Sequence, residues 1–156
     1  MQTKTKRADG EFRGAAKIIV LCASMLPSAV LAQPDTACFD HAASRYQIHP
    51  AILKSISRVE SGGNPAAINR NANGSSDIGH MQINSVWLPT LAKYGIGAKE
   101  LASPCTNTHV GAWILANNFR RMGYGWDAIG AYNAKSPIRR AIYTRKVALA
   151  MGKEIE

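Results

Sequence analysis

The chain has 156 residues, of which 46% are hydrophobic and 19% charged, and its formal net charge is +9 at pH 7. This length is enough for one domain with a single core. The excess of basic groups favours an acidic partner, but the sequence lacks the interleaved basic and aromatic residues that would indicate nucleic-acid binding.

Residues 1–32 have the layout of a secretory signal, in which basic side chains lead into the apolar run IIVLCASMLPSAVLA. This run of about 15 residues is shorter than the roughly 20 that a membrane-spanning helix needs, which disfavours a membrane anchor. A lipid on Cys22 is disfavoured because Leu21 stands where a lipoprotein signal carries a small residue. We therefore expect cleavage near Ala32 and release into the periplasm without a stable membrane span.

The expected mature domain, residues 33–156, carries 14 basic and 8 acidic side chains, a balance of +6. Its basicity is therefore not confined to the signal. In an exported protein, this charge favours an acidic partner outside the cytoplasm.

Helical patterns dominate the rest of the chain, and no long alternation of apolar residues predicts a main sheet, so the fold class is mostly α. One helix is expected at about 38–46. A second should begin at Pro50, which suits a first helical position, and end at the glycine pair 62–63. The residues expected to face the core from this second helix are Ile52, Ile56 and Val59.

Residues 64–84 are rich in Asn, Gly and Ser, which predicts an irregular segment that could include a small β-hairpin. The later ranges expected to be helical are 85–94, 106–122 and 126–134. A last helix should have Ser136 as its N-cap and Pro137 at its first position. The residues expected to turn inward from it are Ile138, Ile142 and Val147.

Two cysteines, Cys38 and Cys105, remain after the expected cleavage, and export would place them where disulfides form. We expect them to be bonded, which would stabilise the fold by roughly 4 kcal/mol in the loop-entropy model. The alternative is a pair of buried free thiols. The four histidines show neither a paired-cysteine spacing nor a pair one helical turn apart, so neither a metal nor another cofactor is expected.

Glu60 is the strongest candidate for a catalytic group. It stands at the end of the second predicted helix, where the helix dipole disfavours a carboxylate, and it follows the apolar Ile56 and Val59. Both features should raise its pKa, as a general acid near neutral pH requires. Considered alone, a glutamate in this position is far more often a solvated residue at a helix end.

Three strings in a fixed order change that balance: Glu60-Ser61, then GHMQIN at 79–84, then Ala-Tyr-Asn at 131–133. The stretch ESGGNPAAINRNANGSSDIGHMQIN resembles the soluble lytic transglycosylases of the lysozyme-like superfamily, most closely the small ones that accompany secretion, conjugation and pilus machines. The resemblance covers roughly residues 38–150. It implies a single lysozyme-like α+β domain, with a small hairpin or irregular segment next to a catalytic glutamate.

The resemblance also implies a reaction in which Glu60 is the lone acid and base. It would protonate the leaving oxygen between N-acetylmuramic acid and N-acetylglucosamine, and then take the proton of the muramic 6-hydroxyl as that hydroxyl attacks the anomeric carbon. The product is a 1,6-anhydro ring. A hydrolase would instead need a second carboxylate, and Asp77 is the only nearby candidate, although an aspartate in NGSSDIG more often organises a turn.

The second string matches the Gly-Leu-Met-Gln motif of the resembled family, which forms a glycan-contacting wall beside the acid. His80 replaces the leucine of that motif, which leaves the packing at this position open between partial exposure and hydrogen bonding. Amide side chains can both donate to and accept from a sugar. The expected substrate contacts in and around the first two strings are Ser61, Asn69, Met81, Gln82 and Asn84. For the amides, the alternative is a role in holding the loop.

In the third string, Tyr132 is expected to bond Glu60 or the substrate's N-acetyl group, and Asn133 to face the cleft. Without the resemblance these would be a core tyrosine beside a capping asparagine. Lys135 stands after Ala134, where the family often has a glycine, and this change affects a loop more than the chemistry. The three tryptophans are assigned to the core rather than the site.

The sequence thus predicts a monomeric peptidoglycan lytic transglycosylase that locally opens the wall for a secretion, conjugation or pilus apparatus. Its expected partners are glycan strands and the proteins of that apparatus, not nucleic acid. Two rivals remain: a true lysozyme that uses Asp77 and water, and a non-catalytic wall-binding or assembly subunit that retains the fold.

Overall fold

A computed structural model describes residues 36–153, so the predicted signal and its cleavage site lie outside the described residues. The helices are α1 (Thr36–Tyr46), α2 (Pro50–Ser61), α3 (Leu88–Leu91), α4 (Ala98–Leu101), α5 (Pro104–Met122), α6 (Trp126–Gly130) and α7 (Pro137–Gly152), with the 3-10 turns η1 (Ser85–Trp87) and η2 (Ala92–Tyr94). The strands are β1 (Ile68–Arg70), β2 (Ser76–Ile78) and β3 (Ile83–Asn84). The predicted fold class, mostly α with a small β element, is confirmed.

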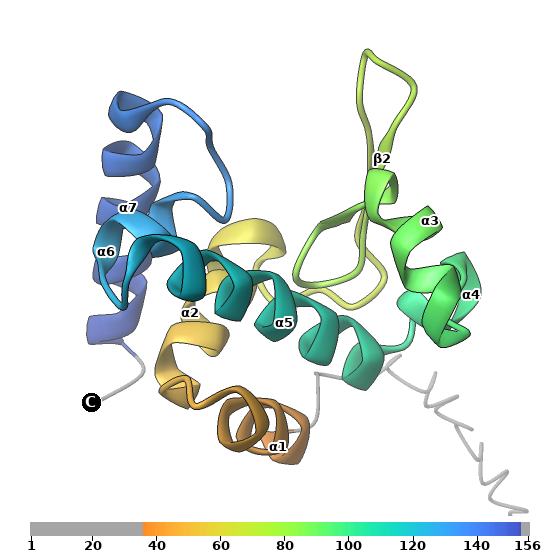
Figure 1. Cartoon of the computed structure of the whole chain (residues 1–156), viewed down its shortest axis with the longest axis horizontal. Coiled ribbons are helices and arrows are strands. Elements are labelled where there is room, and N and C mark those ends of the chain that lie inside the picture. The colour runs from red at the N-terminus through yellow and green to blue at the C-terminus, as the bar shows by residue number, and fades with distance from the viewer. Residues whose placement is uncertain (1–35, 154–156) are drawn as a thin grey trace, which may run out of the picture.

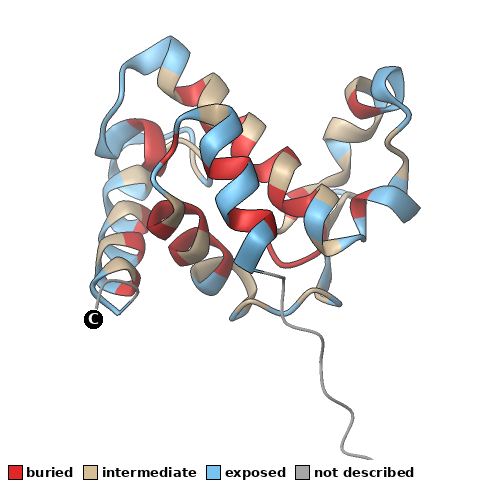
Figure 2. Cartoon of the chain, turned by 90° about the horizontal axis from the view of Figure 1, so that it is seen from below, coloured by how far each residue is buried: buried red, intermediate tan, exposed pale blue. Residues whose placement is uncertain are grey.

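Helix α5 crosses the middle of the molecule, with α6 and α7 at one side and β2, α3 and α4 at the other (Figure 1). It packs against α1, α2, α4, α6 and β3. Its buried residues include Val110, Ala112 and Leu115. Buried residues are concentrated in the central helices, whereas the outer turns are mostly exposed (Figure 2). Among residues 36–153, none of the helices combines the length and the apolarity that crossing a membrane requires.

Both ends of α2 are fixed by local chemistry. His49 caps the start by accepting the amide N–H of Ala51, and Pro50 occupies the first turn. At the other end Gly62 adopts a left-handed φ of 67° and donates its N–H to the carbonyl of Arg58. The predicted start and end of this helix are therefore confirmed, and they place Glu60 in its last turn.

The three strands form an antiparallel sheet in the order β1-β2-β3. Asn69 pairs with Asp77, and Asp77 pairs with Asn84, so these three residues form a row across the sheet. Because residues paired across neighbouring strands project to the same face, this row concentrates polar side chains on one side of the hairpin.

The structure corrects two predictions near the C-terminus. The helix expected at 126–134 ends at Gly130, so the Ala-Tyr-Asn string lies in the turn after it. In α7, Ile138 and Ile142 are 77% and 57% exposed rather than buried. The inward stripe instead consists of Tyr143, Val147 and Ala150, because a helix can turn only one stripe of residues inward.

Cys38 and Cys105 form a disulfide that joins α1 to the first turn of α5, with their Cα atoms 5.2 Å apart. Replacing both cysteines by serine is expected to lower the free energy of unfolding by roughly 4 kcal/mol, because the 67-residue separation is no longer closed in the unfolded chain. Urea unfolding of the two proteins measures this difference. Thiol labelling of Cys38 or Cys105 in the unreduced, denatured wild-type protein would contradict the presence of this disulfide.

Candidate active site

A cleft of about 780 Å³ lies between the hairpin, α5 and the turn that follows α6. Glu60 lies in this cleft together with Tyr132 from the turn. The amide side chains that line it are Asn69, Asn71, Asn73, Gln82, Asn84 and Asn133. A carboxyl group surrounded by groups that both donate and accept hydrogen bonds suits a neutral, hydroxyl-rich ligand such as a sugar.

Glu60 has the electrostatics of a general acid. Burial is the largest influence and raises the pKa of its carboxyl, and the negative charge of Asp77 adds to this. Hydrogen bonds from Tyr143 and Asn133 and the positive charge of Lys146 act in the opposite direction without cancelling the rise. The expected direction of the pKa is confirmed, with desolvation as its main cause.

Tyr143 is the partner of Glu60 that sequence reasoning missed. Its hydroxyl donates to Glu60 Oε1 at 2.6 Å, across a separation of 83 residues. Burial and the charge of Glu60 raise the pKa of Tyr143, so this hydroxyl keeps its proton and remains a donor. Its position four residues before Val147, which was expected to turn inward, was the available signal, but Ile138 and Ile142 were chosen as the other inward residues.

Tyr132 lies in the cleft, yet its hydroxyl donates to the backbone carbonyl of Met81 at 3.0 Å rather than to Glu60. The expected bond to Glu60 is thus made by Tyr143. This hydrogen bond instead connects the third string, residues 131–133, to the second string, residues 79–84. Gly111 on α5 permits this approach, because a Cβ there would lie 2.6 Å from Met81 Cε and 3.1 Å from the Tyr132 hydroxyl.

Met81 is fully buried, so its side chain belongs to the core rather than to the surface of the cleft. Its backbone N–H donates to Asn107 Oδ1 at 2.8 Å. Asn107, also fully buried, donates in turn to the carbonyls of Ile78 and Leu101 at 2.8 and 3.0 Å. A single amide thereby holds the loop of the second string against α5, a role for which no sequence signal was available.

Gln82 and Asn69 form one polar unit in the cleft wall. Asn69 Nδ2 donates to Gln82 Oε1 at 2.6 Å, and Gln82 Nε2 donates to the carbonyl of Gly79 at 2.7 Å. Gln82 has a left-handed φ of 48°, which a non-glycine residue adopts only when its surroundings hold it there. Contact of this pair with substrate stays a prediction that their position permits.

Asp77 lies in the same cleft, with its carboxylate held by two side-chain amides. Asn71 Nδ2 donates to one oxygen at 3.0 Å and Asn84 Nδ2 to the other at 2.7 Å. The oxygen of the Asn84 amide caps η1 by accepting the N–H of Val86. Asp77 therefore organises the hairpin, through amide side chains rather than the backbone N–H groups that the sequence suggested.

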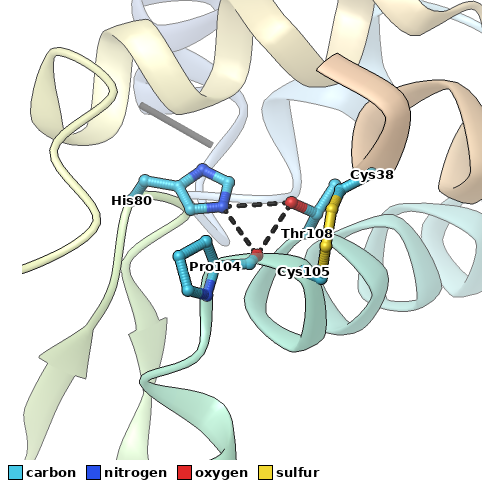
Figure 3. Close-up of a disulfide and its surroundings, with 5 residues drawn as sticks. All are labelled: Cys38, His80, Pro104, Cys105 and Thr108. Carbon is cyan, nitrogen blue, oxygen red and sulfur yellow. Dashed lines mark hydrogen bonds between the residues drawn. A yellow bond between two sulfur atoms is a disulfide. The ribbon is translucent and has the colours of Figure 1, made fainter. Parts of the chain in front are cut away.

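His80 is fully buried and hydrogen-bonded on both ring nitrogens, and Figure 3 shows the contacts of Nε2 with Pro104 and Thr108. Its Nε2 lies 3.1 Å from the Pro104 carbonyl and 3.1 Å from Thr108 Oγ1, and its Nδ1 lies 2.8 Å from Ser57 Oγ. Since a carbonyl can only accept, Nε2 carries the proton and Nδ1 accepts from Ser57. Ser61 Oγ donates to the backbone carbonyl of His80 at 2.9 Å, so Ser61 supports the loop and does not line the cleft.

Replacing His80 by leucine, the residue of the resembled motif, is expected to destabilise the fold by about 1–3 kcal/mol, because Ser57 Oγ loses its buried partner. Burial lowers the pKa of His80. Its contribution to stability is therefore complete above the unfolded-state pKa of about 6.5 and is lost as pH falls through the lower folded-state value.

The test is urea unfolding of wild type and His80→Leu at about pH 8 and about pH 5. The wild type should lose more stability than the variant. His109, whose pKa burial also lowers, is present in both proteins and cancels in the comparison. An equal loss in the two proteins would contradict this assignment.

Comparison with known proteins identifies a family match and several similar proteins. Residues 37–147 match the family described as "Transglycosylase SLT domain". The chain is 39% identical over 112 residues to Invasion protein IagB of Salmonella typhimurium (strain SL1344), a match that covers 71% of this chain and 70% of that protein. It is 44% identical over 98 residues to Protein IpgF of Shigella flexneri, covering 62% and 64%. It is 42% identical over 100 residues to X polypeptide of Escherichia coli (strain K12), covering 64% and 59%.

Proposed function

Since the chain belongs to the transglycosylase SLT domain family, we propose that it is a peptidoglycan lytic transglycosylase that cleaves the β-1,4 bond between N-acetylmuramic acid and N-acetylglucosamine. The observation that carries this proposal is the environment of Glu60. Its carboxyl has a raised pKa, accepts a hydrogen bond from Tyr143 and lies in an amide-lined cleft.

In the proposed reaction, protonated Glu60 gives its proton to the leaving glycosidic oxygen as the bond to the anomeric carbon breaks. The muramic 6-hydroxyl then attacks that carbon, and the Glu60 carboxylate takes the hydroxyl proton. A 1,6-anhydro ring forms, and no water is consumed. Tyr143 and Asn133 orient the carboxyl throughout, while the substrate's own N-acetyl group would stabilise the cationic intermediate.

Mass spectrometry of purified wall digested with the protein tests the reaction. Muropeptides with 1,6-anhydro ends are expected, which are lighter than the hydrolysed products by one water. Reducing ends would identify a lysozyme instead, and a lack of released fragments would identify a non-catalytic wall-binding subunit.

The lysozyme reading retains one supporting observation, because Asp77 lines the same cleft as Glu60 and its charge raises the pKa of Glu60. Its two amide partners favour a structural role. For Asp77→Asn we therefore expect stability and activity to fall together, by about 1–3 kcal/mol in the free energy of unfolding.

Thermal unfolding and muropeptide release, measured on the same preparation, test this expectation. Asp40→Asn is the matched control, since Asp40 is an exposed aspartate of α1 outside the cleft. A stable Asp77→Asn protein without activity would contradict the structural role and favour the lysozyme mechanism.

We further propose that the protein acts in the periplasm for a secretion, conjugation or pilus apparatus. The expected export signal, the disulfide and the charge of +6 on residues 33–156 support export to an acidic wall. The motif resemblance supports the association with an assembly, as does the name of the Salmonella relative, an invasion protein. Cell fractionation tests the location. The mass of the exported protein should correspond to a chain that begins near Gln33.

A further inference from the structure

A second hollow, of about 230 Å³, adjoins the cleft on the side of α7, and we call it the α7 hollow. Glu60, Asn133 and Arg139 line both spaces, so the two meet at the candidate acid. The remaining residues of the α7 hollow are Val59, Ile142, Tyr143 and Lys146. A group attached to a sugar bound beside Glu60 would therefore have this hollow within reach.

Helix α7 presents two cations to the hollow. Arg139 and Lys146 are separated by two turns of the helix, and Ile142 lies between them at helical spacing. Within residues 36–153 neither cation forms an ion pair with a carboxylate, whereas the neighbouring Arg140 pairs with Asp127 at 3.1 Å. Of the residues that the structure describes, Glu60 is the one acidic residue that lines this hollow, and burial raises its pKa, so two cations that lack a salt-bridge partner favour an anionic ligand here.

The ligand must also accommodate Ile142, which is 57% exposed between the two cations. In peptidoglycan, the lactyl group of muramic acid and the first residue of its stem peptide carry methyl groups. The lactyl carboxyl is a free carboxylate only where the stem peptide is absent; otherwise it is amide-bonded to that first residue, and the free carboxylates lie on later residues of the peptide. Neutral N-acetylglucosamine has no such combination. The chemistry of the α7 hollow therefore matches the muramic acid side of the substrate.

We propose that the α7 hollow binds a carboxylate of muramic acid or of its stem peptide, with Arg139 and Lys146 as the recognising cations. This inference rests on the proposed function, because Glu60 defines where the cleaved bond lies. It makes α7 the source of selectivity for charged wall strands over uncharged chitin-like strands.

Binding of three ligands to proteins that carry Glu60→Gln tests the proposal without turnover. The ligands are glycan strands with stem peptides, strands whose peptides an amidase has removed, and uncharged chito-oligosaccharides. Lys146→Gln should weaken binding of wall strands about three- to fivefold and leave chito-oligosaccharide binding unchanged, because Lys146 lines the α7 hollow and not the cleft. Arg139→Gln should weaken binding of wall strands more than binding of chito-oligosaccharides, because Arg139 lines both spaces. Arg145→Gln is the matched control, because Arg145 is an exposed cation of the same helix outside both spaces.

If peptide removal abolishes the effect of the substitutions, the ligand is a stem-peptide carboxylate. Since the amidase frees the lactyl carboxyl from its amide bond, a loss confined to the peptide-free strands would identify the lactyl carboxylate, and a loss with both kinds of strand would show that the hollow accepts either carboxylate. An equal loss in Arg145→Gln, or an equal loss for chito-oligosaccharides, would overturn the proposal. Muropeptide release by the wild type is measured separately, so failure of the proposed reaction is distinguished from failure of carboxylate recognition.

Discussion

Replacing Glu60 with glutamine is expected to slow wall cleavage at least 100-fold, because general acid catalysis typically contributes roughly that much or more. The amide keeps the size of the side chain, and its oxygen can still accept the hydroxyl proton of Tyr143. It has no proton to give the leaving oxygen. Initial rates of muropeptide release measure the effect, and retention of more than about a tenth of the wild-type rate would exclude Glu60 as the acid.

The same substitution has a second consequence, for stability. Burial raises the folded-state pKa of Glu60, so its favourable contribution to stability is complete below the unfolded-state value of 4.5 and is lost as pH rises through the folded-state value. At neutral pH the wild type therefore bears the cost of a desolvated carboxylate. The Glu60→Gln protein should unfold at the same or a higher temperature near pH 7, with a smaller advantage near pH 4, which separates lost chemistry from lost folding.

Replacing Tyr143 with phenylalanine is expected to lower turnover at least about tenfold, because a hydrogen bond to a charged group is worth about 1.5–3 kcal/mol. The ring remains to fill the buried position, while the donor that holds Glu60 Oε1 is removed. That donor lowers the pKa of Glu60, so its loss should raise this pKa further. Glu60 then stays protonated to higher pH, and the alkaline limb of the activity profile should move upward.

Tyr132→Phe is the control for this experiment. Its hydroxyl donates to the carbonyl of Met81 rather than to Glu60, so its removal should leave the alkaline limb in place. The activity of all three proteins is measured from acid to alkaline pH. An upward shift in Tyr132→Phe, or an unmoved limb in Tyr143→Phe, would contradict the assignment of Tyr143 as the partner of the acid.

The position of Glu60 was predictable because the signals that place it are local. Pro50 marks the start of α2 and Gly62 its end, and the apolar spacing between them fixes which face is buried. The order of the three strings then identified the family. Likewise Ser136 caps α7, as its side chain accepts the N–H of Arg139. Each of these effects acts within a few residues and can therefore be recognised from the sequence.

The orientation of α7 was decided by tertiary packing. Several stripes along this helix contain apolar residues, and helical periodicity alone does not choose between them. Contact with α2 and α6 selects the stripe of Tyr143 and Val147 and leaves Ile142 exposed beside the cleft. The same orientation of α7 brings the Tyr143 hydroxyl to Glu60.

For His80 and Tyr132, too, the sequence marks the position but the tertiary structure decides the contacts. The sequence marked both positions, but their hydrogen-bond partners lie 23 to 51 residues away along the chain, on α2, α5 and the second string. A buried polar group must find a partner wherever the fold supplies one. Sequence by itself therefore determined most of the helices, the family and the candidate acid. Only the tertiary structure decided which groups hold that acid, because such partners are brought together by packing between distant segments.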